Sequence, residues 1–218
     1  MASQATPTPQ RRFDNPAVFI CDIQEAFRPT ISSFPSLLLT TKKLIRAATA
    51  LTIPIYITTQ NRARLGPTVP ELTSLIPSPP GPAVDIDKTR FSMYIPPIST
   101  SHFPPFSPST KKAQIAIVGI EAHICVTQTA LDLIGAGHEV YIIADGVSSS
   151  NAEEVPVALA RLRAAGAVVT TSESWVYECM GDAGIAEFRS IVKLVKETAG
   201  DTKASLQALL GTGPASKM

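Results

Sequence analysis

The sequence predicts a three-layer α/β/α fold, in which a mostly parallel, Rossmann-like sheet is covered by helices on both faces. Short apolar segments rich in β-branched residues alternate with segments whose apolar residues recur at helical spacing. The apolar segments are continuous, as is typical of strands that are buried on both faces. Strands that alternate with helices form right-handed βαβ units, and these assemble into a parallel sheet.

The expected elements follow one another in regular order. Strands are predicted at residues 17–23, 53–59, 114–118, 138–145 and 167–171. Helices are predicted at residues 37–52, from Cys125 to 134, at 151–165 and at 185–197, with a short helix after Ser172 or Ser174. Two connections are rich in proline. The first is a long loop over residues 61–82, in which residues 69–75 could form a helical turn. The second, residues 94–108, is expected to be either an irregular connection or a short helix. Loops of this length in a compact domain are usually functional, and here they could border a pocket.

The domain organisation is one domain with two extensions. Residues 1–15 are rich in Gln, Thr and Pro and are expected to be a disordered leader. Residues 16–198 form the predicted domain. Residues 199–218 are small and polar with one apolar patch, so we expect either a loose tail or a segment that docks a partner.

Composition and charge exclude several classes of partner. The chain has 218 residues, 44% of them hydrophobic, which is enough for one sizeable core. Its net charge of +1 gives no field that would indicate nucleic acid or a membrane surface as a partner.

The three cysteines are far apart and do not form a disulfide framework, so a reducing compartment is favoured. No apolar run reaches the ~18 residues of a transmembrane helix, and the first residues lack a secretory signal. We expect a cytoplasmic location, with export without a leader left open.

One stretch, from Gly119 to Cys125, combines a strand end, a turn and a helix start. A thiol at the start of a helix lies among free backbone N–H groups, which favour thiolate over thiol. The same N–H groups could hold a developing oxyanion. The alternative is a small buried core cysteine, since cysteine is among the most buried residue types.

Two charged residues lie at or near other strand ends. Asp22 follows a very apolar run, where an acid is costly unless it is paired or functional; alternatively it only ties down the next loop. Lys88 and Arg90 would share a face of an extended segment, and a solvated charged edge is the alternative. Ligands of parallel α/β folds bind at the carboxyl ends of strands. Asp22, Lys88 and Cys125 all fall at or near such ends, as does Asp145.

Four motifs in this order resemble the isochorismatase-like hydrolases, a cysteine hydrolase superfamily that includes nicotinamidases and N-carbamoyl amidases. The motifs are residues 21–27 (CDIQEAF), 87–93 (DKTRFSM), 119–130 (GIEAHICVTQTA) and 144–149 (ADGVSS). The resemblance extends over about residues 16–196. Residues 161–173 and 181–184 are similar to the subgroup of isochorismatase domain-containing proteins.

The resemblance implies a catalytic triad. In it Cys125 is the nucleophile, Asp22 the proton shuttle, and Lys88 the cation that stabilises thiolate and carboxylate. It also implies a cis peptide between residues 120 and 121, which would aim backbone N–H groups at the substrate oxygen. Residues expected to contact the substrate or its oxyanion are Gln24, Phe27, Ile120 and Glu121.

Neither a metal ion nor another cofactor is expected. Metal-dependent nicotinamidases carry a histidine-containing cluster after the second strand, whereas residues 58–62 here contain no histidine. The three histidines, His102, His123 and His138, are scattered along the chain and do not form a ligand set.

Three functions remain open at this point. The best single hypothesis is hydrolysis of isochorismate to pyruvate and 2,3-dihydroxy-2,3-dihydrobenzoate, with Asp22 as general acid. The second is a metal-independent, nicotinamidase-like amidase that acts on a small amide through a thioester on Cys125. The third is an interaction protein that keeps the fold without turnover. The resemblance also implies a homo-oligomer, either a dimer or a tetramer.

Overall fold

The computed structural model describes residues 10–76 and 83–211. Within them, six parallel strands form one sheet in the order β3-β2-β1-β4-β5-β6. The strands are β1 (Pro16–Cys21), β2 (Ile55–Gln60), β3 (Ala83–Lys88), β4 (Gln114–Gly119), β5 (Glu139–Val147) and β6 (Val168–Thr170). The predicted parallel sheet is confirmed.

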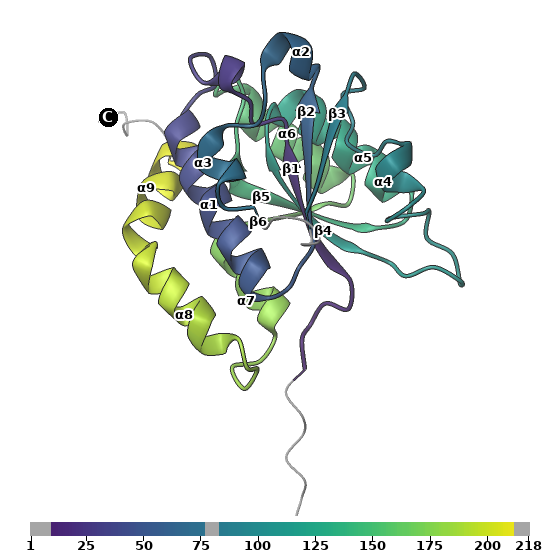
Figure 1. The fold of residues 1–218 in the computed structure, drawn as a ribbon, viewed down its shortest axis with the longest axis vertical. Coiled ribbons are helices and arrows are strands. Elements are labelled where there is room, and N and C mark those ends of the chain that lie inside the picture. Colours follow the sequence, from purple (N-terminus) through teal and green to yellow (C-terminus); the bar gives the residue numbers. More distant parts are fainter. Residues whose placement is uncertain (1–9, 77–82, 212–218) are drawn as a thin grey trace, which may run out of the picture.

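Helices cover both faces of the sheet, which confirms the predicted three layers (Figure 1). One face carries α1 (Phe34–Ala50), α7 (Ser172–Met180), α8 (Phe188–Glu197) and α9 (Ala199–Leu210). The other face carries α4 (Pro96–Ser99), α5 (Thr127–Gly135) and α6 (Glu154–Ala164). Shorter helical segments lie in the connections: η1 (Glu25–Phe27), α2 (Arg62–Leu65), α3 (Pro70–Thr73) and η2 (Ala122–Val126). Each face buries its own apolar core against the sheet.

The two central strands, β1 and β4, define where a ligand can bind. From β1 the chain adds β2 and β3 on one side, and then it crosses over to build β4, β5 and β6 on the other. The strand order therefore reverses between β1 and β4, and the crevice at their carboxyl ends is the usual binding position in such sheets. Cys21 and Gly119 pair at the ends of these two strands.

The N-terminal segment differs from the expected disordered leader. Residues 1–9 lie outside the described residues, but residues 10–15 pack on the domain. The Phe13 ring is buried 5.2 Å from the ring of Tyr141. Arg11 donates hydrogen bonds to the Leu51 carbonyl and to Glu187, at 2.7 and 2.6 Å. One aromatic anchor and one ion pair thus fix a segment whose composition alone indicated disorder.

The C-terminal segment is not a loose tail, which was one of the two alternatives that the sequence left open. Residues 199–210 form α9, which packs along α1. Lys43 Nζ donates to Thr202 Oγ1 at 2.9 Å, and Ser205 Oγ donates to the Ser36 carbonyl at 3.0 Å. The contacts are largely polar, so the sequence lacked the apolar spacing that reveals a packed helix. Residues 212–218 of the predicted tail lie outside the described residues.

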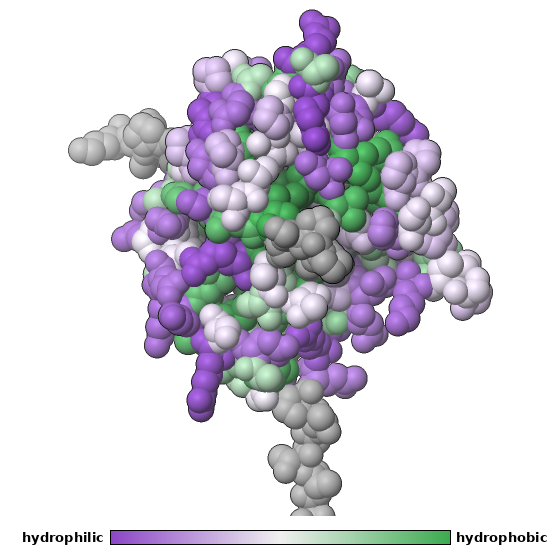
Figure 2. Space-filling view, viewed as in Figure 1, coloured by the Kyte–Doolittle hydropathy of each residue, from purple (hydrophilic) through white to green (hydrophobic). Residues whose placement is uncertain are grey.

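One face of the molecule carries both hydrophilic and apolar residues (Figure 2). Figure 2 shows a mainly hydrophilic face with apolar residues visible toward its middle. None of the helices in residues 10–76 and 83–211 is both long and apolar enough to cross a membrane.

Candidate active site

Asp22 and Lys88 form a buried ion pair at the carboxyl end of the sheet. Asp22 directly follows β1 in the left-handed backbone region, with φ of 53°, and Lys88 is the last residue of β3. Lys88 Nζ lies 2.7 Å from Asp22 Oδ2, and the two side chains are only 1% and 2% exposed. Between them lies β2, whose Thr58 Oγ1 donates to Asp22 Oδ1 at 2.8 Å. Both carboxylate oxygens are therefore occupied and oriented.

Gln60, at the end of β2, is a site residue that sequence reasoning missed. Its Oε1 accepts a hydrogen bond from Lys88 Nζ at 2.8 Å. The ammonium group also lies 3.1 and 3.0 Å from the backbone carbonyls of Arg90 and Phe91. Several acceptors thus aim the lysine at Asp22. Gln60 pairs with Lys88 in the parallel register, and a predicted β2–β3 pairing would have revealed it.

Gln24 holds the backbone of the loop after β2 in place. Its side chain is fully buried and binds backbone only. Its Oε1 accepts from the Gln60 N–H at 2.7 Å, and its Nε2 donates to the Gly66 carbonyl at 2.6 Å. The structure does not bring Gln24 to the cavity wall described below. The expected substrate contact is replaced by a role in holding the loop after β2.

Cys125 lies within η2, the helical turn that joins β4 to α5. The turn after β4 depends on Gly119, whose φ is +121°. A Cβ atom added at this position would overlap the Cys21 carbonyl oxygen. The Ile120–Glu121 peptide bond is cis. The sequence predicted a helix start near Cys125. In the structure, the helical turn η2 begins slightly earlier, at Ala122.

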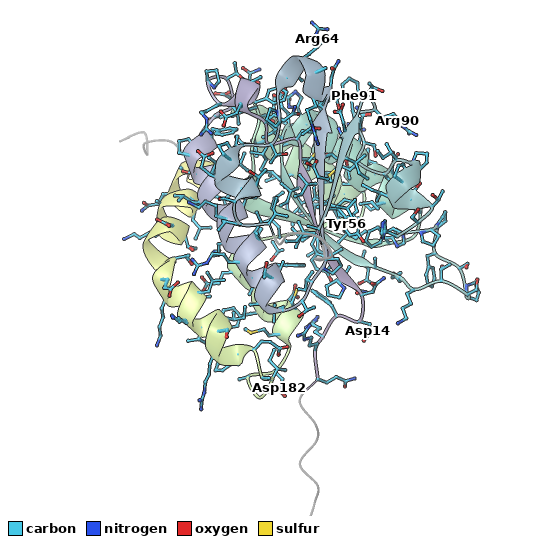
Figure 3. The ribbon with its side chains drawn as sticks, in the orientation of Figure 1. Asp14, Tyr56, Arg64, Arg90, Phe91 and Asp182 are labelled. Atoms are coloured by element: carbon cyan, nitrogen blue, oxygen red, sulfur yellow. The ribbon has the colours of Figure 1, made fainter. Side chains whose placement is uncertain are left out.

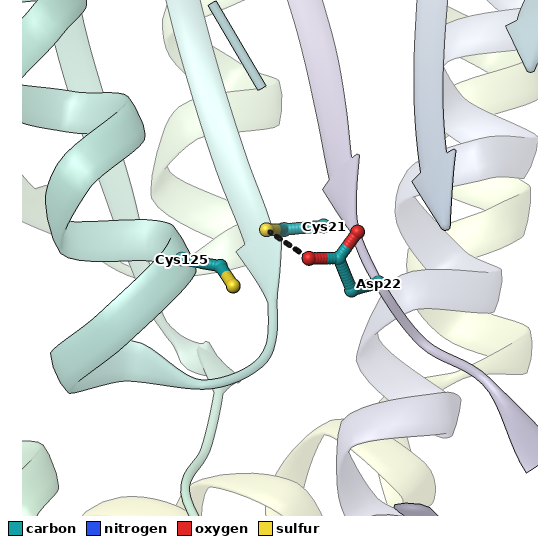
Figure 4. A group of neighbouring side chains, drawn as sticks. All are labelled: Cys21, Asp22 and Cys125. Atoms are coloured by element: carbon teal, nitrogen blue, oxygen red, sulfur yellow. Dashed lines mark hydrogen bonds between the residues drawn. The ribbon is translucent and has the colours of Figure 1, made fainter. Parts of the chain in front are cut away.

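A second thiol, Cys21, lies beside Cys125 and Asp22. The two sulfurs and a carboxylate oxygen of Asp22 all lie within 4.8 Å of one another, and Figure 4 shows the three side chains converging. Cys21 Sγ donates to Asp22 Oδ2 at 3.6 Å. Burial raises the pKa of the Cys21 thiol, and its hydrogen bond with Cys125 and the Asp22 charge raise it further. In the sequence, Cys21 stands out only as part of the first motif.

Asp22, Gln60 and Cys125 border a cavity of about 210 Å³. Its walls are mostly apolar and contain three of the predicted contact residues. The lining residues are Asp22, Phe27, Gln60, Leu65, Phe91, Ile120, Glu121, Ile124 and Cys125. Cys125 is 7% exposed and so reaches the cavity, whereas Cys21 is fully buried behind it. Figure 3 shows Phe91 and Arg64 at the same end of the molecule, opposite Asp14 and Asp182.

Two of the other charged residues lie apart from this cluster. Arg90, which the sequence placed on the same face as Lys88, has a side chain that is 65% exposed. Asp145 accepts hydrogen bonds from the backbone N–H and hydroxyl of Ser172, at 2.7 and 2.6 Å. Asp145 therefore ties β5 to the start of α7.

The donor set fits a metal ion poorly. Cys21, Asp22 and Cys125 could together offer three ligand atoms. However, the Lys88 ammonium already lies 2.7 Å from the Asp22 carboxylate, and a second cation at that carboxylate would be repelled. The absence of a metal remains a prediction.

Comparison with known proteins shows the family to which the chain belongs. The model of the isochorismatase domain matches residues 16–174. The chain belongs to the isochorismatase family. Among isochorismatase-like relatives, the secreted isochorismatase effector Isc1 of Phytophthora sojae is 39% identical over 180 residues, which cover 83% of this chain and 84% of the relative. Isochorismatase domain-containing protein 2 of Homo sapiens is 36% identical over 185 residues, 85% of each chain.

Among solved structures, the isochorismatase-like fold is matched by one described as MAR1 ribonuclease from Caenorhabditis elegans. That structure has a TM-score of 0.80 and 36% identity, with 97% of this chain and 100% of the other covered. The family resemblance stated from the motifs is thus confirmed, and with it membership of a hydrolase family. One relative is described as secreted, so the cytoplasmic location remains a prediction.

Proposed function

We propose that this protein is a small-molecule hydrolase in which Cys125 is the nucleophile, Asp22 moves the proton and Lys88 orients Asp22. The observation that carries the proposal is the meeting of three features at one cavity. A thiol that reaches the cavity lies within 4.8 Å of a carboxylate oxygen, and that carboxylate is held by a buried lysine at 2.7 Å. A nucleophile, a base and a group that orients the base, all close together, are the signature of covalent catalysis.

The proposed chemistry is acyl transfer. Asp22 accepts the thiol proton while Cys125 Sγ attacks the carbonyl carbon of an amide. Backbone N–H groups of Glu121 and Cys125 stabilise the oxyanion. Asp22 then returns the proton to the leaving amine, and a thioester remains on Cys125. Water, deprotonated by Asp22, hydrolyses the thioester and restores the free thiol.

The cavity indicates the substrate class. At about 210 Å³ it is smaller than the ~300–1,000 Å³ of sites that take drug-sized ligands. Two phenylalanines, Phe27 and Phe91, and three aliphatic side chains line it. A small, uncharged amide with an apolar or planar acyl group matches this environment.

Isochorismate is the second candidate substrate, because the Phytophthora sojae relative is described as an isochorismatase effector. In that reaction Asp22 would protonate the vinyl ether and Cys125 would not be required. Isochorismate carries two carboxylates, whereas no side chain among the described lining residues is cationic. An unpaired charge is costly to bury, so the geometry favours the neutral amide.

One experiment separates the two chemistries. Wild type, Cys125→Ala and Asp22→Asn are assayed for ammonia release from a panel of small amides and for pyruvate release from isochorismate. Circular dichroism checks that each variant is folded. Cys179→Ala is the matched control, since Cys179 is buried in α7 on the other face of the sheet.

We expect ammonia release that falls at least about 10³-fold in Cys125→Ala and is retained in Cys179→Ala. Pyruvate release that survives in Cys125→Ala and is lost in Asp22→Asn would instead establish the isochorismatase reaction. Folded wild type that turns over neither class would contradict both. The predicted homo-oligomer remains a proposal, to be checked by light scattering of the same preparations.

A further inference from the structure

Cys21 is a thiol that the proposed hydrolysis does not use. It is fully buried at the end of β1, behind Cys125 and beside Asp22. Packing alone would be satisfied by any small apolar side chain. A second sulfur within 4.8 Å of the first adds a chemistry that an apolar residue lacks.

We infer that Cys21 and Cys125 form a reversible oxidation site, in which a peroxide oxidises Cys125 and Cys21 then closes a disulfide with it. The inference stands independently of the proposed hydrolysis, because it depends only on the position and access of the two thiols. The oxidant that reacts at this site is a small hydroperoxide.

The backbone supports the approach of the two sulfurs. Cys21 pairs with Gly119 across β1 and β4, and the chain returns to this position through η2, only six residues later. The sulfurs start no more than 4.8 Å apart and must reach about 2.05 Å. Rotation of the Cys125 side chain together with a small shift of η2 supplies the movement.

Access decides the order of the two steps. Cys125 borders the cavity and Cys21 does not, so a small peroxide meets Cys125 first. The Cys125 sulfur attacks one peroxide oxygen, the O–O bond breaks, and sulfenic acid and water form; the sulfur loses two electrons and the peroxide gains them. A larger oxidised thiol such as glutathione disulfide is excluded by the size of the cavity.

The second step has a proton acceptor in place. Cys21 Sγ donates to Asp22 Oδ2 at 3.6 Å, so Asp22 takes the proton as the Cys21 sulfur attacks the sulfenic sulfur. The S–O bond breaks, and the departing hydroxide takes the proton from Asp22 to leave as water. Because burial raises its pKa, Cys21 remains a thiol until that attack.

The test is intact-mass spectrometry of the full chain before and after dilute hydrogen peroxide. We expect the monomer to lose about 2 Da, two of its three thiols to resist alkylation in denaturant, and dithiothreitol to reverse both changes. Peptide mapping should join the peptides of Cys21 and Cys125. Cys179→Ala should behave as wild type, because α7 lies on the other face of the sheet.

Two variants make the result decisive. In Cys21→Ala the sulfenic acid has no resolving thiol, so we expect a gain of about 32 or 48 Da that dithiothreitol does not reverse. In Cys125→Ser the buried Cys21 should keep its mass under the same treatment. A wild type that gains 32 Da without losing 2, or a disulfide that maps to Cys179, would overturn the inference. No substrate is needed, so the result is independent of the hydrolase assays.

Discussion

At the scale of single residues, the Asp22–Lys88 pair shows how a charged site is kept inside an apolar sheet. Each charge offsets the cost of burying the other. In addition, Thr58 donates a hydrogen bond to the carboxylate and Gln60 accepts one from the ammonium group. Removal of one partner from such a pair leaves an uncompensated buried charge, which costs far more than the loss of a surface pair.

Lys88→Met is therefore expected to lower the free energy of unfolding by about 3–5 kcal/mol, as measured by urea denaturation. The control is Arg46→Met, which breaks the exposed pair between Arg46 and Glu197 and should cost far less. Adding Asp22→Asn to Lys88→Met should restore part of the loss. Equal costs for the two single variants would refute the account of a buried pair.

The sequence predicted some of these residues and not others, for physical reasons. An acid after an apolar run and a cysteine after a glycine turn are conspicuous, so Asp22 and Cys125 could be found without a structure. Gln60 and Cys21 gave no such signal, since a glutamine after a strand is common and a cysteine within a buried strand looks like packing. Their roles depend on which strand lies next to which.

At the scale of elements, the connection from β4 to α5 determines where Cys125 lies. Gly119 lets the chain pass directly over the end of β1, because any side chain there would collide with the Cys21 carbonyl. Its φ of +121° also falls in a region that other residues rarely adopt. The turn is thus fixed by both space and backbone conformation.

Gly119→Ala should lower the free energy of unfolding by several kcal/mol, more than the ~1–3 kcal/mol typical of one strained backbone position, because steric overlap adds to strain. Gly200→Ala is the matched control: it lies in α9 with nothing within 4 Å of an added Cβ. There the substitution should raise stability by up to about 1 kcal/mol. Thermal melts of both variants test the contrast, and a Gly119→Ala variant as stable as wild type would contradict it.

Among the elements, the buried strands were the easiest to predict and α9 the hardest. Central strands must be apolar on both faces, so β1, β4 and β5 are evident in the sequence. The α9 helix keeps few residues buried and binds α1 partly through hydroxyl groups. Its apolar spacing is correspondingly weak, and a tail was the natural expectation.

A chain that ends at residue 198 tests whether α9 belongs to the domain. Its removal should expose one side of α1 and lower the free energy of unfolding by roughly 2 kcal/mol or more, the scale of burying one large apolar side chain. A chain that ends at residue 211 is the control and should retain wild-type stability. Equal stability of the two truncated chains in urea would show that α9 is dispensable.

At the scale of the whole molecule, His138 links stability to pH. Its Nδ1 accepts from the Ala113 N–H and its Nε2 donates to the Phe103 carbonyl, both at 3.3 Å, as a neutral imidazole does. Burial lowers the pKa of His138 below its ordinary value, and the positive charge of Lys112 lowers it further. The unfolded chain therefore binds the proton more readily than the folded protein does.

The sign of the effect follows from this difference. The contribution of His138 to stability is fully present above its unfolded pKa of about 6.5 and is lost progressively as the pH falls through the depressed folded pKa. His138→Gln should thus lose less stability than wild type between pH 7.5 and pH 5, as measured by urea denaturation at both values. Identical losses would mean that His138 does not carry the effect.

The position of β1 in the middle of the sheet has a consequence for synthesis of the chain. Its partner on one side, β2, emerges soon after it, but residues 114–119 on the other side follow about 100 residues later. At ~5–20 residues per second, one edge of a fully apolar strand stays unpaired for roughly 5–20 seconds. Unpaired apolar edges are templates for aggregation, so slower translation of the segment before β4 should lower the yield of native protein and increase its dependence on chaperones.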